Sequence, residues 1–314
     1  TAVVAVSKSG ATLETVAKLS TVYEHVARRV GEERVDEHFG VVTGQDSPLR
    51  RFAEGRGIEV FDVPEGVGGR FSVLSAVGVV PLMAAGLDVE PLMQGAAAAR
   101  DRWLEEVKIG PAAELSPATS TAADVVGLER AGASELVMMS YIDRAAGLVD
   151  WFRQLLAESL GKRENRDGEQ VETGLTPIKA AGPVDQHSQV QLYVEGEPRR
   201  GIMFLSELTP PSDQSIGPTE TMVPDLNGLS ESSFSELREA EMRGTRRALQ
   251  EAGVPTATWR FSRLNASTVG EFLMNWELAT AVAGEMLNVN AFDQPGVERG
   301  KRLAKQILSG DSEM

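Results

Sequence analysis

Apolar and polar positions alternate with two different periods along the first part of the chain. Short runs of β-branched and other apolar residues occur in the opening TAVVAV and over residues 39–44 and 58–64, and they predict buried strands. Behind the first run, Val16, Leu19, Tyr23 and Val26 share one helix face, and a second helix is predicted from Leu49. This strand and helix order predicts an α/β fold with a parallel sheet flanked by helices.

The same alternation returns in the second part of the chain. ELVMMSY (135–141) and GIMFLS (201–206) read as buried strands, and QVQLYVEG reads as a helix between them. A helix is also predicted over 144–161, with these residues inward: Leu148, Val149, Phe152, Leu155 and Leu156. Residues 71–93 predict packed helical pieces, and the periodicity predicts terminal helices over 234–252, 269–286 and 297–308.

Two polar stretches interrupt this pattern. Residues 110–121 are rich in Pro, Ala, Ser and Thr, which predicts a linker and places a domain boundary there. We therefore expect one domain over 1–110 and a second over 111–314. Residues 210–231 are rich in Pro, Ser and Gly and predict a loop or lid.

Composition narrows the classes of function. The chain has 314 residues, a formal net charge of −15 and no cysteine. A strongly acidic protein is a poor partner for nucleic acid, and the lack of cysteine excludes disulfides and thiolate metal sites. No apolar run approaches membrane length. We expect a cytoplasmic protein that binds neither nucleic acid nor membrane.

Hydroxyl groups gather where the first strand meets the first helix, in Ser7-Lys8-Ser9-Gly10-Ala11-Thr12. Free backbone N–H groups and the positive end of the helix dipole favour an anion such as phosphate at this place. The alternative is plain capping, because Ser and Thr begin many helices that bind nothing. The Walker pattern GxxxxGK[ST] and the GxGxxG pattern are both absent from this junction.

Three other stretches contain candidate chemistry. Arg70 follows glycines at the end of a predicted strand. Parallel sheets bind ligands at this end, so Arg70 is a candidate ligand contact. The alternative is a solvated arginine in a flexible turn, which would have the same sequence pattern. Gln154 and Glu158 lie one turn apart on an apolar helix, which suits a proton-abstracting base or an ordinary surface glutamate. His187 opens a polar helix, and without cysteine or a second nearby histidine it does not indicate a metal site.

Five blocks in one order resemble the glucose-6-phosphate isomerase family from the first residue to Ile307: SKSGATLET, GGRFSVLSAVG, FRQLLAESLGK, DQHSQVQLYVEG and NAFDQPGVERGKRLAKQI. The resemblance implies two sugar isomerase (SIS) domains and a homodimer with a shared active site. It implies interconversion of glucose 6-phosphate and fructose 6-phosphate through a cis-enediol, in glycolysis and gluconeogenesis, with neither metal nor organic cofactor.

The resemblance also implies a role for each matched residue. Glu158 is expected to be the base that moves a proton between C2 and C1, and Arg70 the cation beside the enediolate. His187, supplied by the partner subunit, and Lys301 are expected to open the sugar ring. The residues expected to contact substrate are Ser7, Lys8, Ser9 and Thr12 at the phosphate, together with Gln154 and Gln294.

The chain departs from the family pattern in three ways. Leu160 and Pro295 stand where the family more often has asparagine and tryptophan, and the family's first part, with its GIGGS-type turn, is missing. We therefore expect the first SIS domain to be incomplete at its N-terminus. Two alternatives stay open: a noncatalytic sugar-phosphate-binding regulator, and an isomerase that also accepts mannose 6-phosphate. Glu158, His187 and Lys301 together favour an enzyme over a regulator.

Overall fold

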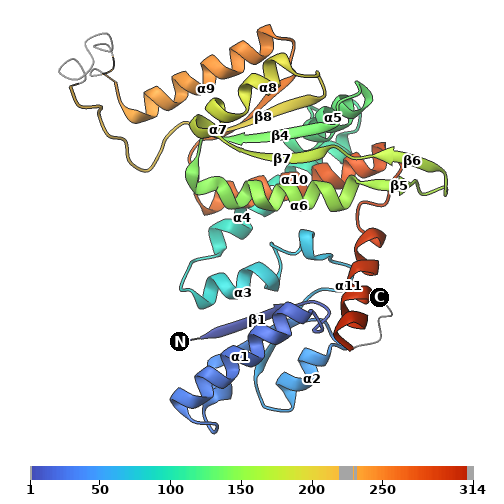
Figure 1. Ribbon diagram of the computed structural model, residues 1–314. Coiled ribbons are helices and arrows are strands. Elements are labelled where there is room, and N and C mark those ends of the chain that lie inside the picture. The colour runs from blue at the N-terminus through green and yellow to red at the C-terminus, as the bar shows by residue number, and fades with distance from the viewer. Residues whose placement is uncertain (1, 219–228, 230–231, 310–314) are drawn as a thin grey trace. The chain divides into compact units, whose positions relative to one another are not determined.

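The fold was taken from a computed structural model, which describes residues 2–218, 229 and 232–309. The chain divides into two compact units, residues 1–101 with 269–274 and residues 102–268 with 275–314. This division falls inside a helix, nine residues before the predicted boundary, and it assigns a short piece of a late helix to the first unit. Figure 1 shows the elements of each unit.

The first unit is built on a three-stranded parallel sheet of order β1-β2-β3. Its strands are β1 (Val3–Ser7), β2 (Phe39–Thr43) and β3 (Glu59–Asp62). Its helices are α1 (Leu13–Val30), α2 (Pro48–Glu54), α3 (Ala76–Ala84) and the first part of α4 (Glu90–Ile109). The three predicted strands are therefore confirmed, together with the helices that follow them.

Helix α1 covers the sheet with only part of its predicted apolar face. Leu19, Tyr23 and Val26 pack on the core around Val41 and Phe39, whereas Val16 is 44% exposed. Val16 shares this helix face by its spacing, but the core does not cover it. Its apolar neighbours Leu13 and Val22 are exposed as well, so residues 13–22 of α1 expose apolar side chains in this chain.

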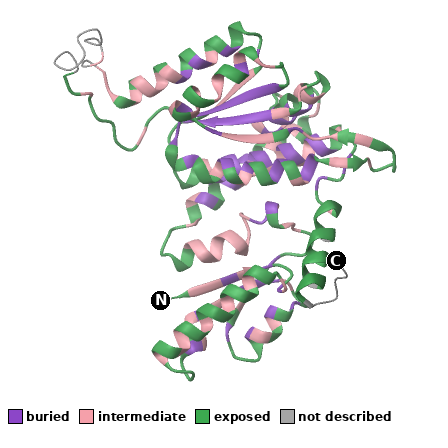
Figure 2. Cartoon of the chain, in the orientation of Figure 1, coloured by how far each residue is buried: buried purple, intermediate pink, exposed green. Residues whose placement is uncertain are grey.

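The second unit contains a four-stranded parallel sheet of order β7-β4-β8-β9. Its strands are β4 (Glu135–Ser140), β7 (Thr176–Ala181), β8 (Arg200–Glu207) and β9 (Thr256–Phe261), and a small antiparallel hairpin is made by β5 (Lys162–Glu164) and β6 (Gln170–Thr173). The central strands β4 and β8 are the most deeply buried, as Figure 2 shows. Such burial explains why both read as continuous apolar runs.

The predicted helices over 144–161, 234–252, 269–286 and 297–308 and in QVQLYVEG are present in the predicted order, whereas the helix over 117–130 was not predicted. The helices of the second unit are α5 (Pro117–Arg130), α6 (Ala146–Leu160), α7 (Gly182–Ser188), α8 (Val190–Glu195), α9 (Phe234–Glu251), α10 (Ala266–Met286) and α11 (Pro295–Ser309). The described residues also form short 3₁₀ turns. Two lie in the first unit, η1 (Val35–His38) and η2 (Gly69–Phe71), and η3 (Asp143–Ala145) lies in the second. Four of the five residues predicted inward on α6 are buried, and Leu148 is half-buried.

The predicted linker over 110–121 is shorter than expected. Helix α5 begins at Pro117, and Ser116 caps it by accepting a hydrogen bond from the Thr119 N–H at 3.3 Å. Proline at the first helical position and serine before it are a helix-start signal, so this composition was misread as a linker. Of the predicted loop or lid over 210–231, residues 219–228 and 230–231 lie outside the described residues.

Candidate active site

The SKSGAT segment forms a tight turn at the carboxyl end of β1. Ser7 is the last residue of the strand and is buried, and the Gly10 N–H donates to the Ser7 carbonyl at 3.1 Å. Gly10 has φ of +61°, which side chains rarely adopt. A Cβ at this position would also lie 2.6 Å from the Ser47 Cβ. Glycine is therefore required here for two separate reasons.

The loop after β2 holds this turn in place. The Thr43 hydroxyl donates to the Ser7 carbonyl at 2.7 Å, and the Gly44 N–H donates to the Lys8 carbonyl at 3.0 Å. Thr43 also shares a 2.7 Å hydrogen bond with the Ser47 hydroxyl, and Ser47 caps α2. Sequence reasoning missed these supports, although the Thr-Gly pair at the end of a predicted strand was visible.

Helix α1 begins directly after the turn without a side-chain cap. Thr12 occupies the N-cap position, but its hydroxyl lies 3.0 Å from the Ser7 hydroxyl and makes no cap bond. Ser9 and Thr12 are both exposed. The first N–H groups of an 18-residue helix and two accessible hydroxyls thus converge at one place, an arrangement suited to an anion.

Arg70 lies on a loop that contacts this turn. The Lys8 ammonium donates to the Val67 carbonyl at 2.7 Å, three residues before Arg70. Arg70 is only 2% exposed and its guanidinium lies 5.4 Å from the centre of the Phe71 ring. An arginine this deeply buried is fixed by its surroundings. The alternative that Arg70 is a solvated side chain in a flexible turn was therefore wrong.

Gln154 and Glu158 face one another on α6. The Gln154 amide donates to the Glu158 carboxylate at 3.1 Å, with Gln154 exposed and Glu158 half-buried. Glu158 lines a cavity of about 970 Å³ within the second unit, and Gln294 lines the same cavity. The structure therefore brings together two residues that the family resemblance singled out from distant blocks.

Lys162 links the two walls of this cavity and was missed from the sequence. Its ammonium donates to the carbonyl of Glu158 at 3.2 Å and to the carboxylate of Asp293 at 2.8 Å. The Lys162 side chain is 7% exposed, whereas its partner Asp293 is 52% exposed, so a buried ammonium pairs with a carboxylate that still meets solvent. The lysine holds the segment before Gln294 against the end of α6.

His187 is exposed on the short helix α7, directly after β7. Burial of Asp185 opposes ionisation of its carboxyl, but hydrogen bonds from the Ala181 N–H and the Ser188 hydroxyl hold its pKa below the usual range. The anionic Asp185 fixes the start of the helix. His187 is thus presented on a well-anchored turn at the surface of the unit.

Glu158 and His187 lie near opposite ends of β7. The end of α6 meets the residues before β7, because the Thr173 hydroxyl donates to the Leu160 carbonyl at 2.7 Å. Helix α7 begins immediately after the six residues of the strand, which span about 17 Å. One copy of the chain therefore does not bring its own His187 to its own Glu158.

Lys301 lies on α11, and its side chain is exposed. The first turn of α11, from Pro295 to Val297, lines the same cavity as Glu158, so Lys301 lies about one turn beyond that wall.

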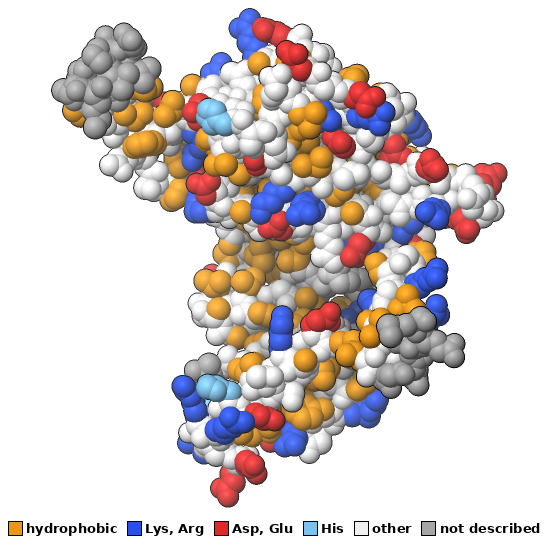
Figure 3. Space-filling model, in the orientation of Figure 1, with side chains coloured by type: hydrophobic (Ala, Val, Ile, Leu, Met, Phe, Trp, Pro, Cys, Tyr) orange, Lys and Arg blue, Asp and Glu red, His pale blue; other side chains and the backbone are white. Residues whose placement is uncertain are grey.

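Figure 3 shows acidic and basic side chains interspersed on the face of the molecule that is in view. No cluster of three or more histidine, aspartate or glutamate side chains in the described part of the chain could hold a metal ion.

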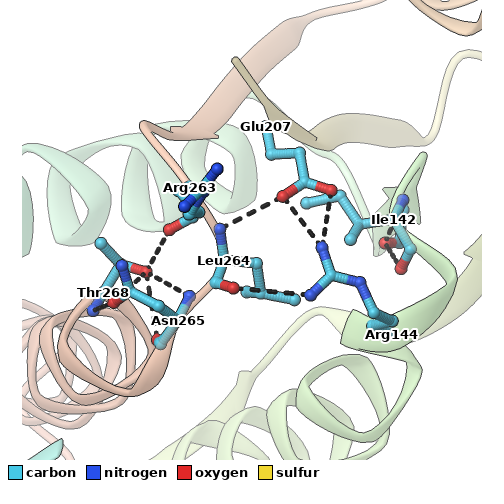
Figure 4. A network of polar contacts seen from close by, with 8 residues as sticks. Ile142, Arg144, Glu207, Arg263, Leu264, Asn265 and Thr268 are labelled. Carbon is cyan, nitrogen blue, oxygen red and sulfur yellow. Dashed lines mark hydrogen bonds and ion pairs between the residues drawn. The ribbon is translucent and has the colours of Figure 1, made fainter. Parts of the chain in front are cut away.

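A separate polar network closes the carboxyl edge of the second sheet, and Figure 4 shows it from close by. Arg144 donates to both carboxylate oxygens of Glu207, at 2.9 and 3.1 Å, and the Leu264 N–H donates to the same carboxylate at 3.2 Å. The Glu207 side chain is only 2% exposed. This network joins the ends of β4, β8 and β9 and serves the fold.

None of the described helices combines the length and hydropathy needed to cross a membrane.

The family model described as "Phosphoglucose isomerase" matches residues 1–209 and 229–313. The chain is 40% identical over 304 residues to a glucose-6-phosphate isomerase of Carboxydothermus hydrogenoformans, covering 96% of this chain and 64% of that protein. It is also 40% identical to that of Rubrobacter xylanophilus, covering 95% of this chain and 66% of the relative.

Two solved structures share the fold. A protein of Thermus thermophilus, described as hypothetical, superimposes with a TM-score of 0.88 at 37% identity, over 98% of this chain and 71% of that one. A glucose-6-phosphate isomerase of Chlamydia trachomatis gives a TM-score of 0.85 at 27% identity, over 100% of this chain and 60% of that one. The chain spans about two thirds of the length of the two relatives that it matches at 40% identity.

Proposed function

The chain belongs to the phosphoglucose isomerase family, and on that premise we propose that it interconverts glucose 6-phosphate and fructose 6-phosphate. The observation that carries the proposal is the cavity lined by both Glu158 and Gln294 and tied together by Lys162. A half-buried carboxylate that lines this cavity and accepts a hydrogen bond from Gln154 suits proton transfer next to a carbonyl. The reaction belongs to glycolysis and gluconeogenesis, which fits a cytoplasmic location.

The turn after β1 holds the phosphate of the sugar. Ser7, Lys8, Ser9 and Thr12 surround the uncapped start of α1, where N–H groups and hydroxyls donate to phosphate oxygens. This binding is remote from the reacting carbons. Its energy positions the sugar, so a substrate without phosphate loses rate as well as affinity.

Glu158 removes the proton from C2 of glucose 6-phosphate and returns it to C1, with the reverse order for fructose 6-phosphate. The developing enediolate carries negative charge on oxygen, and the Arg70 guanidinium stabilises it. Gln154, which donates to Glu158 at 3.1 Å, orients the carboxylate, and Gln294 contacts the sugar. Proton transfer and charge stabilisation by side chains need neither metal nor organic cofactor.

Ring opening uses His187 and Lys301, and it needs a second copy of the chain. Imidazole titrates near neutral pH and suits an acid and base pair with an amine. The separation of Glu158 and His187 along β7 supports a homodimer in which the partner subunit supplies the histidine. Each active site then draws on both subunits.

The test is a coupled assay of fructose 6-phosphate conversion with Glu158→Gln beside the unchanged chain. We expect Glu158→Gln to lower kcat by about 10²- to 10⁴-fold, the range for loss of a general base. Glu164→Gln is the matched control, because Glu164 is an exposed carboxylate on the same cavity. Full activity of Glu158→Gln would remove Glu158 from the mechanism.

A second outcome would replace the proposed activity. If the unchanged chain is inactive while fructose 6-phosphate still raises its thermal unfolding midpoint, the chain binds the sugar phosphate without converting it. The noncatalytic regulator would then be the better description. Parallel assays with mannose 6-phosphate measure whether the substrate range is broader.

A further inference from the structure

Helix α9 and strand β9 form a basic groove at the edge of the second sheet. We define the groove by the residues that line a cavity of about 540 Å³ there: Glu239, Arg243, Arg246, Arg247, Gln250, Thr258 and Arg260. Four arginines and one glutamate share this cavity in a chain whose net charge is −15. The local sign of charge is thus opposite to that of the whole molecule.

The groove has a regular construction. Three side-chain pairs join the helix to the strand in antiparallel order, Gln250 with Thr256 at 2.9 Å, Arg246 with Thr258 at 3.2 Å, and Glu239 with Arg260 at 2.9 Å. The helix residues of the groove recur at intervals of three and four, so they form one stripe along α9. These contacts fix how far the helix lies from the strand.

Arg243 belongs to this stripe but makes none of the three helix-to-strand contacts. It lies one turn from both Glu239 and Arg246, lines the groove, and is exposed. Among the residues that the structure describes, it has neither a hydrogen-bond nor an ion-pair partner. Arg246 beside it donates to a neutral hydroxyl, that of Thr258, so this contact does not neutralise its charge.

The remaining charges in the groove are partly compensated. Arg260 is paired with Glu239 at 2.9 Å, and Arg247 is paired with Glu251 at 2.8 Å in an exposed position. Exposed ion pairs are weak and exchange readily with other anions. The uncompensated charge therefore centres on Arg243 and Arg246, which lie on the helix. Arg260, which is paired with Glu239, lies across from them on the strand.

We propose that this groove is a second anion site, which takes a small molecule bearing phosphate groups. Guanidinium groups bind phosphate through paired N–H donors, and several of them converge here. The cavity volume fits a small ligand. The acidic charge of the whole chain opposes a nucleic acid as the occupant. The site is distinct from the turn after β1 and needs no residue of the proposed isomerase mechanism.

Pyrophosphate is the probe, and titration calorimetry on the full chain is the measurement. The turn after β1 also binds phosphate in the proposed function, so the titration is made in the background Ser9→Ala with Thr12→Ala. We expect one binding event to persist in that background. Loss of all pyrophosphate binding there would overturn the groove as a site, whatever the isomerase assay shows.

The groove variant combines Arg243→Gln with Arg246→Gln. We expect it to weaken pyrophosphate binding at least about tenfold, because two charged donors are removed. Arg28→Gln with Arg29→Gln on α1 is the control, since it changes the net charge equally at two exposed arginines outside the groove. An unchanged affinity in the groove variant, or an equal loss in the control, would overturn the proposal.

Arg243→Lys guards against a folding defect and tests the geometry. It keeps the positive charge at an exposed position but loses the planar pair of donors. We expect its affinity for pyrophosphate to lie between those of the unchanged chain and the double variant. Its thermal unfolding midpoint, followed by circular dichroism, should be unchanged. Affinity equal to that of the unchanged chain would mean that a diffuse charge, and no built site, attracts the probe.

Discussion

Gly10 is constrained by both its backbone and its neighbours. Its φ is +61°, and a Cβ would lie 2.6 Å from the Ser47 Cβ. Gly10→Ala should therefore destabilise the chain by about 2–4 kcal/mol, because strain and overpacking add. The free energy of unfolding from denaturant titration measures this loss. Phosphate binding should weaken together with stability.

Gly57 provides the matched control for Gly10. It also has positive φ, +72°, but nothing lies within 4 Å of the place that a Cβ would take. Gly57→Ala should lower the free energy of unfolding by about 1 kcal/mol through backbone strain alone. Equal losses in the two variants would show that the contact with Ser47 relaxes without penalty.

Glu277 is a half-buried acid in the middle of α10, and its Oε1 is shielded from solvent. Burial raises the pKa of its carboxyl to about 8, and its Oε1 has no hydrogen-bond partner among the described residues. The unfolded chain releases this proton near pH 4.5, whereas the folded chain holds it to about pH 8. The contribution to stability is therefore complete below about pH 4.5 and is lost as the pH rises toward 8.

Glu277→Gln should remove this dependence, because glutamine resembles the neutral acid. We expect the variant to match the unchanged chain near pH 5 and to exceed it by a few kcal/mol near pH 8. Urea midpoints at several pH values are the measurement. Parallel curves for the two proteins would show that Glu277 ionises normally.

Among the elements, Lys162 connects the end of α6 to the segment directly before α11. Lys162→Met removes a largely buried ammonium that donates to Asp293 and to the Glu158 carbonyl. We expect a loss of about 1–2 kcal/mol in the free energy of unfolding and faster amide exchange over residues 290–294. In the assay of the proposed isomerase activity, KM for fructose 6-phosphate should rise, because Gln294 directly follows Asp293 in the sequence.

Lys179 offers a comparable ion pair in a more exposed place. Its ammonium lies 2.8 Å from the Asp150 carboxylate, the same distance as in the Lys162 pair, but its side chain is 36% exposed. Lys179→Met should change stability by about 0–0.5 kcal/mol. Similar losses in both lysine variants would remove the special role of Lys162.

Most elements could be predicted because their apolar pattern is strong. The buried strands β4 and β8 read as continuous apolar runs, and α6 shows a clear apolar face. The hairpin of β5 and β6 was missed because its strands are short and largely exposed. Its Asp167-Gly168 turn, with φ of +78° at Gly168, was the available signal.

The candidate site was predictable only in part. Gln154 and Glu158 follow from helical spacing, and the turn after β1 follows from its hydroxyls and glycine. Gln294 and Lys301 have no local pattern that indicates chemistry, so only the family resemblance pointed to them. Lys162 depends on a contact with Asp293, 131 residues away, which no local pattern reveals.

On the scale of the whole molecule, the separation of Glu158 from His187 predicts a shared active site. Mixing subunits of Glu158→Gln with subunits of His187→Gln should restore activity, since a mixed dimer has one site with both native residues. Random pairing should give about a quarter of the activity of the unchanged protein. Co-expression with two different tags and assay of each purified dimer is the measurement.

The outcome that contradicts a shared site is equally clear. If both residues came from one subunit, every site in the mixed dimer would lack one of them. The mixture would then be no more active than the average of its two parents. Size-exclusion chromatography of each variant confirms that pairing itself is intact.

The bonds that tie the turn after β1 to the loop after β2 have a consequence for the anion binding that we propose for this turn. Thr43 and Gly44 already hold the carbonyls of Ser7 and Lys8 before any ligand arrives. If this turn holds phosphate as proposed, the ligand orders almost no chain there, and the protein loses little conformational entropy. The affinity of the ligand depends instead on exchanging water for fixed N–H and hydroxyl donors. Binding there should be fast, and it should leave the backbone where it was.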